Sequence, residues 1–175
     1  MPDAPTKKHT LLLVDDDQFL LNMYALKFRN SGFEVDIVNS AAVALQKLRE
    51  GLSPDVILCD LIMPAMDGFE FLKRLREERL ASSSAVMVLT NTNQQDEIDR
   101  ALKFGVDGYI VKASAIPSEV VEEVKKFPII FLSPIPQTFI PIAIGTNPQT
   151  LVFSSKTQPS INKNFSLLIE NLNAN

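Results

Sequence analysis

Residues with carboxylate, hydroxyl and ammonium groups stand at the ends of four short apolar runs of this sequence. They are Asp15, Asp16, Asp60, Thr90 and Lys112. Three carboxylates brought together repel one another, and Mg²⁺ is the usual oxygen-binding cation that neutralises them while also binding a phosphate. The lysine adds a point charge for a phosphate oxygen, and the threonine adds a hydroxyl donor. Because a carboxylate can act as the nucleophile, this set suits phosphoryl transfer to an aspartate.

These residues can meet only if the apolar runs are strands of one sheet. The runs alternate with stretches of helical period, which gives five strand-then-helix units between residues 10 and about 127. The expected strands cover 11–14, 34–38, 56–59, 86–89 and 109–111, and the expected helices begin near residues 17, 40, 69, 94 and 117. Nearly continuous apolar strands indicate a parallel sheet covered by helices on both faces. An open, doubly wound α/β sheet follows, and its site lies beyond the carboxyl ends of the strands.

The helix that follows the first strand is predicted from its apolar spacing and its cap. Its apolar residues recur at roughly helical spacing: Phe19, Leu20, Met23, Leu26 and Phe28. Asp17 is expected to cap this helix, and Ser40 to cap the next one. A run of three aspartates alone would equally suit a helix N-terminus, where carboxylates interact favourably with the helix dipole. The prediction of a site therefore depends on Asp60, Thr90 and Lys112 ending neighbouring strands.

Four segments in this order resemble the receiver domain of two-component response regulators. They are Leu-Leu-Val-Asp-Asp-Asp at 12–17, Asp-Leu-Ile-Met-Pro-Ala-Met-Asp-Gly at 60–68, Val-Leu-Thr-Asn at 88–91 and Gly-Tyr-Ile-Val-Lys-Ala at 108–113. The intervals of 44 residues from Asp16 to Asp60, 30 to Thr90 and 22 to Lys112 are also similar to those of the family. The resemblance covers residues 10 to about 127. It implies a five-stranded, CheY-like (flavodoxin-like) sheet with strand order 2-1-3-4-5.

The resemblance also implies a role for each residue of the site. Asp60 would accept a phosphoryl group from a histidine kinase or phosphotransfer protein. The Mg²⁺ ligands would be Asp15, Asp16, Asp60 and the backbone carbonyl of Ile62. The phosphoryl group would be held by Thr90, Asn91 and Lys112.

The same resemblance implies a switch. Tyr109 would move inward when Thr90 is drawn to the phosphate, and the surface of the fourth helix, fifth strand and fifth helix would then engage a protein target. Tyr109 is alternatively a half-buried strand aromatic with no such role. A protein of this kind catalyses only its own phosphorylation and dephosphorylation, so it is not expected to be a metabolic enzyme.

Two positions depart from the family pattern. Ala113 stands where a proline usually follows the lysine, often after a cis peptide; a cis bond before a residue other than proline costs about 2.5–4 kcal/mol, so either the site imposes it or the loop is trans. Ile62 is apolar where polar side chains are common, so it cannot position a hydrolytic water. We therefore expect slow loss of the phosphoryl group.

Two other functions stay open at this point. A Mg²⁺-dependent phosphohydrolase with an aspartyl nucleophile would normally carry a second aspartate at position 62, where Ile62 stands. A pseudo-receiver, folded but not phosphorylated, would act as an interaction module. The complete set of site residues argues against a pseudo-receiver. Ala113 and the unusual composition of residues 128–175 are compatible with one.

Composition restricts the class of protein further. The net charge is −4, which argues against a nucleic-acid surface because phosphate binding needs clustered Lys and Arg. Cys59 is the only cysteine and His9 the only histidine, so an intrachain disulfide and a catalytic site built on a mid-chain histidine are excluded. With neither a signal peptide nor an apolar run long enough to cross a membrane, we expect a cytoplasmic protein without a membrane partner.

The two ends differ from residues 10–127 in composition. Residues 1–9 form a short polar segment that we expect to be a flexible lead. Residues 128–175 hold six prolines and only three charged residues. This tail lacks a helix-turn-helix pattern and any catalytic motif. Three interpretations of the tail stay open. It is an extension that docks on the domain, a linker or interaction segment, or the product of a frame shift.

Overall fold

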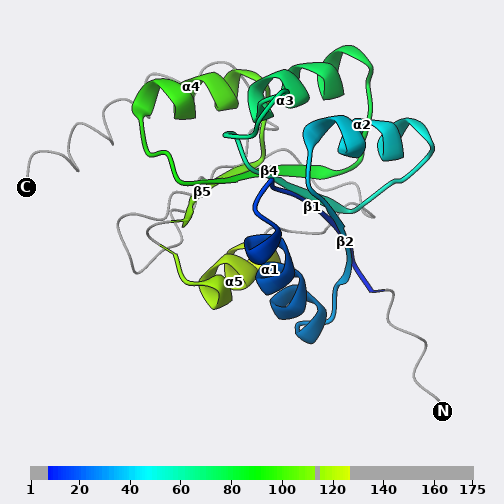
Figure 1. The fold of residues 1–175 in the computed structure, drawn as a ribbon, viewed down its shortest axis with the longest axis vertical. Helices are drawn as coiled ribbons and strands as arrows, with labels where there is room; N and C mark the ends of the chain where they lie inside the picture. Colours follow the sequence, from blue (N-terminus) through cyan, green and yellow to red (C-terminus); the bar gives the residue numbers. More distant parts are fainter. Residues whose placement is uncertain (1–7, 113–114, 127–175) are drawn as a thin grey trace, which may run out of the picture.

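The computed structural model of the chain describes residues 8–112 and 115–126, and it contains alternating strands and helices (Figure 1). The strands are β1 (Thr10–Val14), β2 (Glu34–Val38), β3 (Val56–Cys59), β4 (Ala85–Thr90) and β5 (Gly108–Val111). The helices are α1 (Gln18–Asn30), α2 (Ala41–Arg49), α3 (Gly68–Glu77), α4 (Gln95–Lys103) and α5 (Pro117–Lys126). Each strand is followed by a helix, as the sequence pattern predicts.

The strands form one parallel sheet in the order β2-β1-β3-β4-β5. This confirms the predicted fold class and strand order. The register matters for the site: Val14 of β1 pairs with Cys59 of β3, and Thr90 of β4 pairs with Val111 of β5. The polar residues that follow these pairs therefore emerge at the same edge of the sheet.

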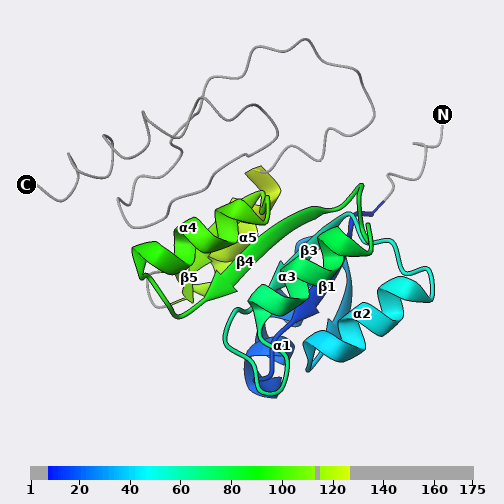
Figure 2. The same cartoon turned by 90° about the horizontal axis from the view of Figure 1, so that it is seen from above.

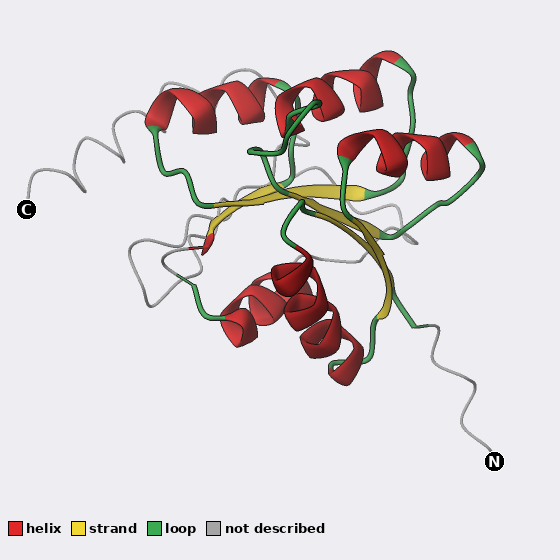
Figure 3. Ribbon diagram, in the orientation of Figure 1, coloured by secondary structure: helices red, strands yellow, loops and turns green. Residues whose placement is uncertain are grey.

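Helices cover both faces of the sheet. Figures 1 and 3 show α1 and α5 on one face and α2, α3 and α4 on the other. In the turned view of Figure 2, α2, α3 and α4 lie in a row over the sheet. This is the doubly wound arrangement that leaves the carboxyl ends of the strands as the open edge of the molecule.

The core consists of two layers because successive strand residues point to opposite faces. Leu12 and Cys59 pack under α2, α3 and α4, whereas Leu13 and Leu58 pack under α1 and α5. The central strands β1 and β3 are buried on both faces, which explains their continuous apolar sequence.

The predicted helix caps are confirmed. The Asp17 carboxylate accepts hydrogen bonds from the backbone N–H groups of Phe19 (2.8 Å) and Leu20 (3.1 Å) at the start of α1. The Ser40 hydroxyl accepts one from the N–H of Val43 (3.3 Å) at the start of α2. These caps fix where both helices leave the edge of the sheet that carries the site.

The apolar spacing that predicted α1 does not identify its buried face. Phe19 is 73% exposed and Leu26 is 60% exposed. The residues that face the sheet are Leu21, Tyr24, Ala25 and Phe28. Apolar residues occur on several sides of this helix, so spacing alone cannot choose the side that packs.

Some predictions concern residues that the structure does not describe. The peptide between Lys112 and Ala113, the lead before residue 8 and the tail from 128 to 175 lie outside the described residues. His9, assigned to the lead, is described: its carbonyl accepts a hydrogen bond from the N–H of Glu34 (2.8 Å). None of the helices described is long and apolar enough to cross a membrane.

Candidate functional site

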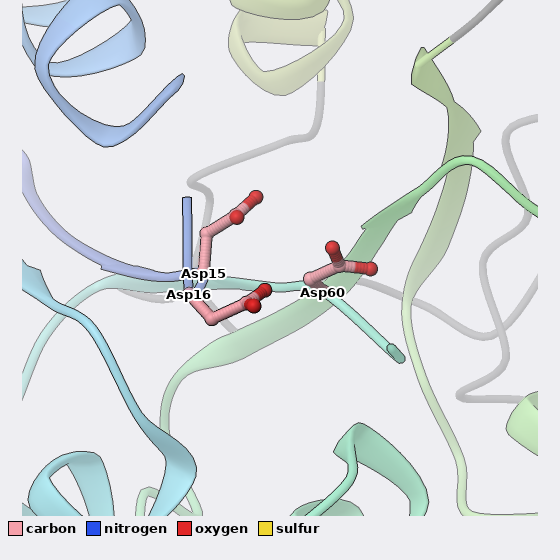
Figure 4. Close-up of side chains that lie close together, drawn as sticks. All are labelled: Asp15, Asp16 and Asp60. Carbon is pink, nitrogen blue, oxygen red and sulfur yellow. The ribbon is translucent and has the colours of Figure 1, made fainter. Parts of the chain in front are cut away.

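The three predicted carboxylates lie together beyond the ends of β1 and β3. Asp15 and Asp16 directly follow β1, and Asp60 directly follows β3. One carboxylate oxygen from each lies within 4.8 Å of the other two, and Figure 4 shows the three side chains close together. Asp15 and Asp60 are buried, whereas Asp16 is exposed. The cluster thus has two inner carboxylates and one that faces solvent.

Lys112 joins the two buried carboxylates. Its Nζ lies 2.5 Å from Oδ2 of Asp15 and 2.7 Å from Oδ2 of Asp60. The side chain of Lys112 is only 6% exposed, so both ion pairs are shielded from water and resist screening by salt. Three carboxylates against one ammonium leave a charge of about −2 when all four groups are ionised.

The remaining oxygens of the two buried carboxylates accept backbone hydrogen bonds. Oδ1 of Asp15 accepts from the N–H of Asp17 (2.9 Å), and Oδ1 of Asp60 accepts from the N–H of Ile62 (3.2 Å). These bonds fix the carboxylate planes before any ligand arrives. A preset geometry of this kind is what a reaction at one carboxylate oxygen requires.

Burial and charge act in opposite directions on the ionisable groups of the site. Burial raises the pKa of Asp15, although the hydrogen bond from Lys112 partly offsets this effect. Burial disfavours the charge on Lys112 as well, but its hydrogen bonds to Asp15 and Asp60 outweigh burial and raise its pKa. Lys112 therefore stays charged at neutral pH, as its predicted partnership with phosphoryl oxygens requires.

Thr90 ends β4 with an unused hydroxyl. The residue is fully buried, and its Oγ1 has no hydrogen-bond partner among the described residues. A buried hydroxyl without a partner is unfavourable, so this hydroxyl is a donor left available to a ligand. An acceptor arriving at the strand ends would satisfy it. Asn91, the next residue, is exposed at the start of the loop to α4.

Tyr109 lies inside the domain in this structure. It is 3% exposed, and its hydroxyl donates a hydrogen bond to the carbonyl of Thr92 (3.1 Å) in the loop after β4. Tyr109 is therefore more buried than the alternative of a half-buried strand aromatic predicted, and its role as a switch stays a prediction. The hydrogen bond connects β5 to the loop that begins beside Thr90.

The loop after Asp60 is held close to β3. A Cβ on Gly68 would stand 2.3 Å from the carbonyl oxygen of Asp60 and 2.6 Å from Cα of Leu61, so only glycine fits there. The Asp67 carboxylate caps α3 by accepting from the N–H of Glu70 (2.8 Å). Ile62 is 60% exposed, so its apolar side chain stands at the rim of the site.

Sequence reasoning missed Tyr24 as a neighbour of the site. It is a buried residue of α1, and it lines a small hollow together with Asp15 and Asp60. The sequence held one sign of this position. Tyr24 carries a polar hydroxyl although it lies among the residues of α1 that face the sheet. Cys59, the last residue of β3, is buried, and burial raises the pKa of its thiol well above the ordinary value.

The donor set fits a hard divalent cation. Carboxylate oxygens are the ligands that Mg²⁺ and Ca²⁺ prefer, and three of them converge from β1 and β3. The excess negative charge is of the size that one such ion balances. Exposed Asp16 leaves the solvent side open for waters or a phosphate.

Fold and site together define a receiver domain of a two-component response regulator. The chain belongs to this family: the model of the response regulator receiver domain matches residues 11–133.

Two response regulators are similar in sequence to this chain. The DNA-binding response regulator MtrA of Mycobacterium tuberculosis is 32% identical over 120 residues, which cover 69% of this chain and 50% of that protein. The nitrate/nitrite response regulator protein NarL of Escherichia coli is 37% identical over 105 residues, 59% of this chain and 47% of that protein. The chain thus matches about half the length of these relatives.

Solved structures agree on the fold. The chemotaxis response regulator CheY4 of Vibrio cholerae superposes with a TM-score of 0.63 at 26% identity, covering 69% of this chain and 98% of that one. A CheY-like response regulator receiver domain protein of Methanospirillum hungatei superposes with a TM-score of 0.62 at 27% identity, covering 69% and 93%.

Proposed function

We propose that residues 10–127 form a receiver domain that is phosphorylated on Asp60 by a histidine kinase or a phosphotransfer protein. The observation that carries the proposal is the pairing of Lys112 with both Asp15 and Asp60 beside the unpartnered hydroxyl of Thr90. A nucleophile, a countercharge and a free donor thus stand at one edge of the sheet.

The reaction is a transfer between two nucleophiles. An oxygen of Asp60 bonds to phosphorus as the bond from phosphorus to the donor's imidazole nitrogen breaks, and the imidazole leaves with the electron pair of that bond. Lys112 pairs with the phosphoryl oxygens, and the hydroxyl of Thr90 and the amide of Asn91 donate to them. The ammonium already lies 2.7 Å from Asp60, so only a short movement is needed.

The cation is proposed to be Mg²⁺. Its ligands would be carboxylates of Asp15, Asp16 and Asp60 and the carbonyl of Ile62. When bound, the ion neutralises charge on the transferring phosphoryl group. The short separation of the three carboxylates supports this proposal.

The output is proposed to be a change in the surface formed by α4, β5 and α5. Thr90, drawn to the phosphoryl group, would favour the inward position of Tyr109, and a downstream protein would bind the resulting surface. The hydrogen bond from Tyr109 to the carbonyl of Thr92 supports a coupling between the site and the start of α4. We expect this signalling to take place in the cytoplasm.

Intact mass spectrometry after incubation with acetyl phosphate and Mg²⁺ tests the proposal. The expected result is one phosphoryl adduct in the unaltered chain and none in Asp60→Ala. Repeated turnover of small phosphomonoesters would instead indicate a phosphohydrolase, and absence of an adduct would indicate a pseudo-receiver. Either outcome would refute the proposal.

A further inference from the structure

The helix α4 buries few apolar side chains, in contrast to its neighbour α3. Figures 1 and 2 show the two helices side by side on one face of the sheet. The buried residues of α4 are Ile98 and Ala101, and within the described part of the chain the side chain of Gln94 forms no capping hydrogen bond at its N-terminus. The buried residues of α3 are Gly68, Phe69, Phe71, Leu72 and Leu75. Because tertiary packing supplies most of the stability of a helix in a protein, α4 is held less firmly than α3.

The start of α3 lies directly against the strand end that carries Asp60. The N–H of Gly68 donates a hydrogen bond to the carbonyl of Leu61 (2.9 Å). Gly68 is also so close to the carbonyl oxygen of Asp60 that a Cβ has no room between them. A close backbone contact of this kind leaves α3 little freedom to move relative to Asp60. The helix α3 is therefore a fixed neighbour for α4.

Two arginine contacts join α4 to α3. The guanidinium carbon of Arg100 on α4 lies 4.0 Å from the ring centroid of Phe69 on α3, a distance at which a cation is attracted to the face of an aromatic ring. In the other direction, Arg76 of α3 donates to the carbonyls of Phe104 (2.7 Å) and Gly105 (2.6 Å), which follow the last turn of α4. A cation is favourable at that end of a helix. A shift of α4 by about 1 Å would lengthen these hydrogen bonds beyond bonding distance.

The same structure holds Tyr109 inside the domain. Its hydroxyl donates to the carbonyl of Thr92 in the loop that leads to α4, and the proposed function assigns this inward position to the phosphorylated state. The loop follows Thr90, which a phosphoryl group on Asp60 would draw toward itself. The two arginine contacts and the inward Tyr109 thus occur together in one arrangement of α4. Contacts formed in one arrangement stabilise it relative to the others.

We propose that Arg76 and Arg100 are positioning residues that favour the arrangement of α4 adopted when Asp60 carries a phosphoryl group. The inference rests on the proposed function, because it concerns the response of the same site. Both arginines act through the position of α4 and not on the reacting atoms. By linkage, contacts that favour this arrangement also raise the affinity of the site for an analogue of the phosphoryl group.

The affinity for beryllofluoride, which binds a carboxylate in place of a phosphoryl group, tests the inference. Titration calorimetry at saturating Mg²⁺ should give a dissociation constant about threefold higher in Arg100→Gln and in Arg76→Gln than in the unaltered chain. The dissociation constant of Mg²⁺ alone should change less than about twofold, because Mg²⁺ without a phosphoryl group does not draw Thr90 inward. Arginines that only stabilise the fold would lower the midpoint of urea unfolding and leave the affinity for beryllofluoride unchanged.

Phe69→Leu tests whether Arg100 acts through the ring. Leucine keeps an apolar side chain at this position and removes the aromatic face. Because each single change removes the same contact, the double variant of Phe69→Leu and Arg100→Gln should bind beryllofluoride no more weakly than the weaker of the two single variants. Losses that simply add in the double variant would contradict a contact between the two side chains.

Arg74→Gln is the matched control for the loss of one positive charge. Arg74 also lies on α3, but it pairs with Glu70 of the same helix (2.9 Å). Its dissociation constant for beryllofluoride should equal that of the unaltered chain. An unchanged dissociation constant in Arg100→Gln or in Arg76→Gln, or an equal rise in Arg74→Gln, would overturn the inference and leave the proposed function standing. If the unaltered chain binds no beryllofluoride, the proposed function itself fails and the inference with it.

Discussion

Replacing Asp16 with asparagine should stabilise the metal-free domain. Asp16 contributes a carboxylate oxygen within 4.8 Å of those of Asp15 and Asp60. At that separation two unit charges repel by about 0.9 kcal/mol in a water-like dielectric and by about 3.5 kcal/mol at an effective dielectric constant of 20. Asp16 is exposed, so the lower value applies to each pair, and Lys112 offsets part of it. We expect a gain of about 1 kcal/mol.

Bound cation should remove this advantage. For the unaltered chain, Mg²⁺ at ten times its dissociation constant should add about 1.4 kcal/mol to the free energy of unfolding. Asp16→Asn lacks one ligand carboxylate and should gain far less at the same concentration. Urea unfolding followed by circular dichroism, once with EDTA and once with Mg²⁺, measures both quantities at low salt.

Asp17→Asn is the control for the change in charge. Asp17 neighbours Asp16 but caps α1 instead of joining the carboxylate cluster, and asparagine caps about as well as aspartate. Loss of its charge near the helix N-terminus should cost about 0.3–1 kcal/mol, and its response to Mg²⁺ should match that of the unaltered chain. An Asp16→Asn domain that is less stable in EDTA, or that gains as much from Mg²⁺ as the unaltered chain, would refute the reasoning.

Three further substitutions probe the loop after β3. Gly68→Ala should destabilise the domain by about 1–3 kcal/mol in urea unfolding, because the added Cβ would stand 2.3 Å from the carbonyl oxygen of Asp60; an unchanged midpoint would contradict the close approach. Ala65→Gly should raise stability by about 0.5–1 kcal/mol, because φ is +65° and glycine removes that strain at a smaller cost in chain entropy; a loss of stability would count against it. Ile62→Asn should shorten the lifetime of the phosphorylated protein about tenfold, because the asparagine side chain adds one hydrogen bond to the hydrolytic water. Intact mass spectrometry follows the decay of the adduct. Decay no faster than in the unaltered chain would exclude a role for Ile62 in retaining the phosphoryl group.

Much of the fold could be predicted from the sequence because buried strands have a recognisable pattern of apolar residues. Strands covered on both faces are nearly continuous apolar runs, and each run here ends at a polar residue. The ends of neighbouring parallel strands lie at one edge, so the positions of Asp15, Asp60 and Lys112 in sequence already determined that they would meet. The structure brings them together as expected.

Other features depend on three-dimensional packing that no local pattern records. The buried side of α1 could not be chosen from the sequence, because Phe19 and Leu26 are as apolar as the residues that face the sheet. Tyr24 was overlooked because the hollow that it lines together with Asp15 depends on the crossing of α1 over β1 and β3. The requirement for Gly68 reflects contact with the backbone of Asp60, eight residues earlier in the chain.

Mapping the phosphoryl adduct to a peptide tests the role of Asp60 most directly. The protein is incubated with acetyl phosphate and Mg²⁺, digested at acidic pH to preserve the acyl phosphate, and analysed by tandem mass spectrometry. We predict a single phosphoryl group on the peptide that contains Asp60, which is absent when EDTA replaces Mg²⁺. An adduct on a peptide without Asp60, or one that persists in Asp60→Asn, would contradict the assignment of Asp60 as the phosphoryl acceptor.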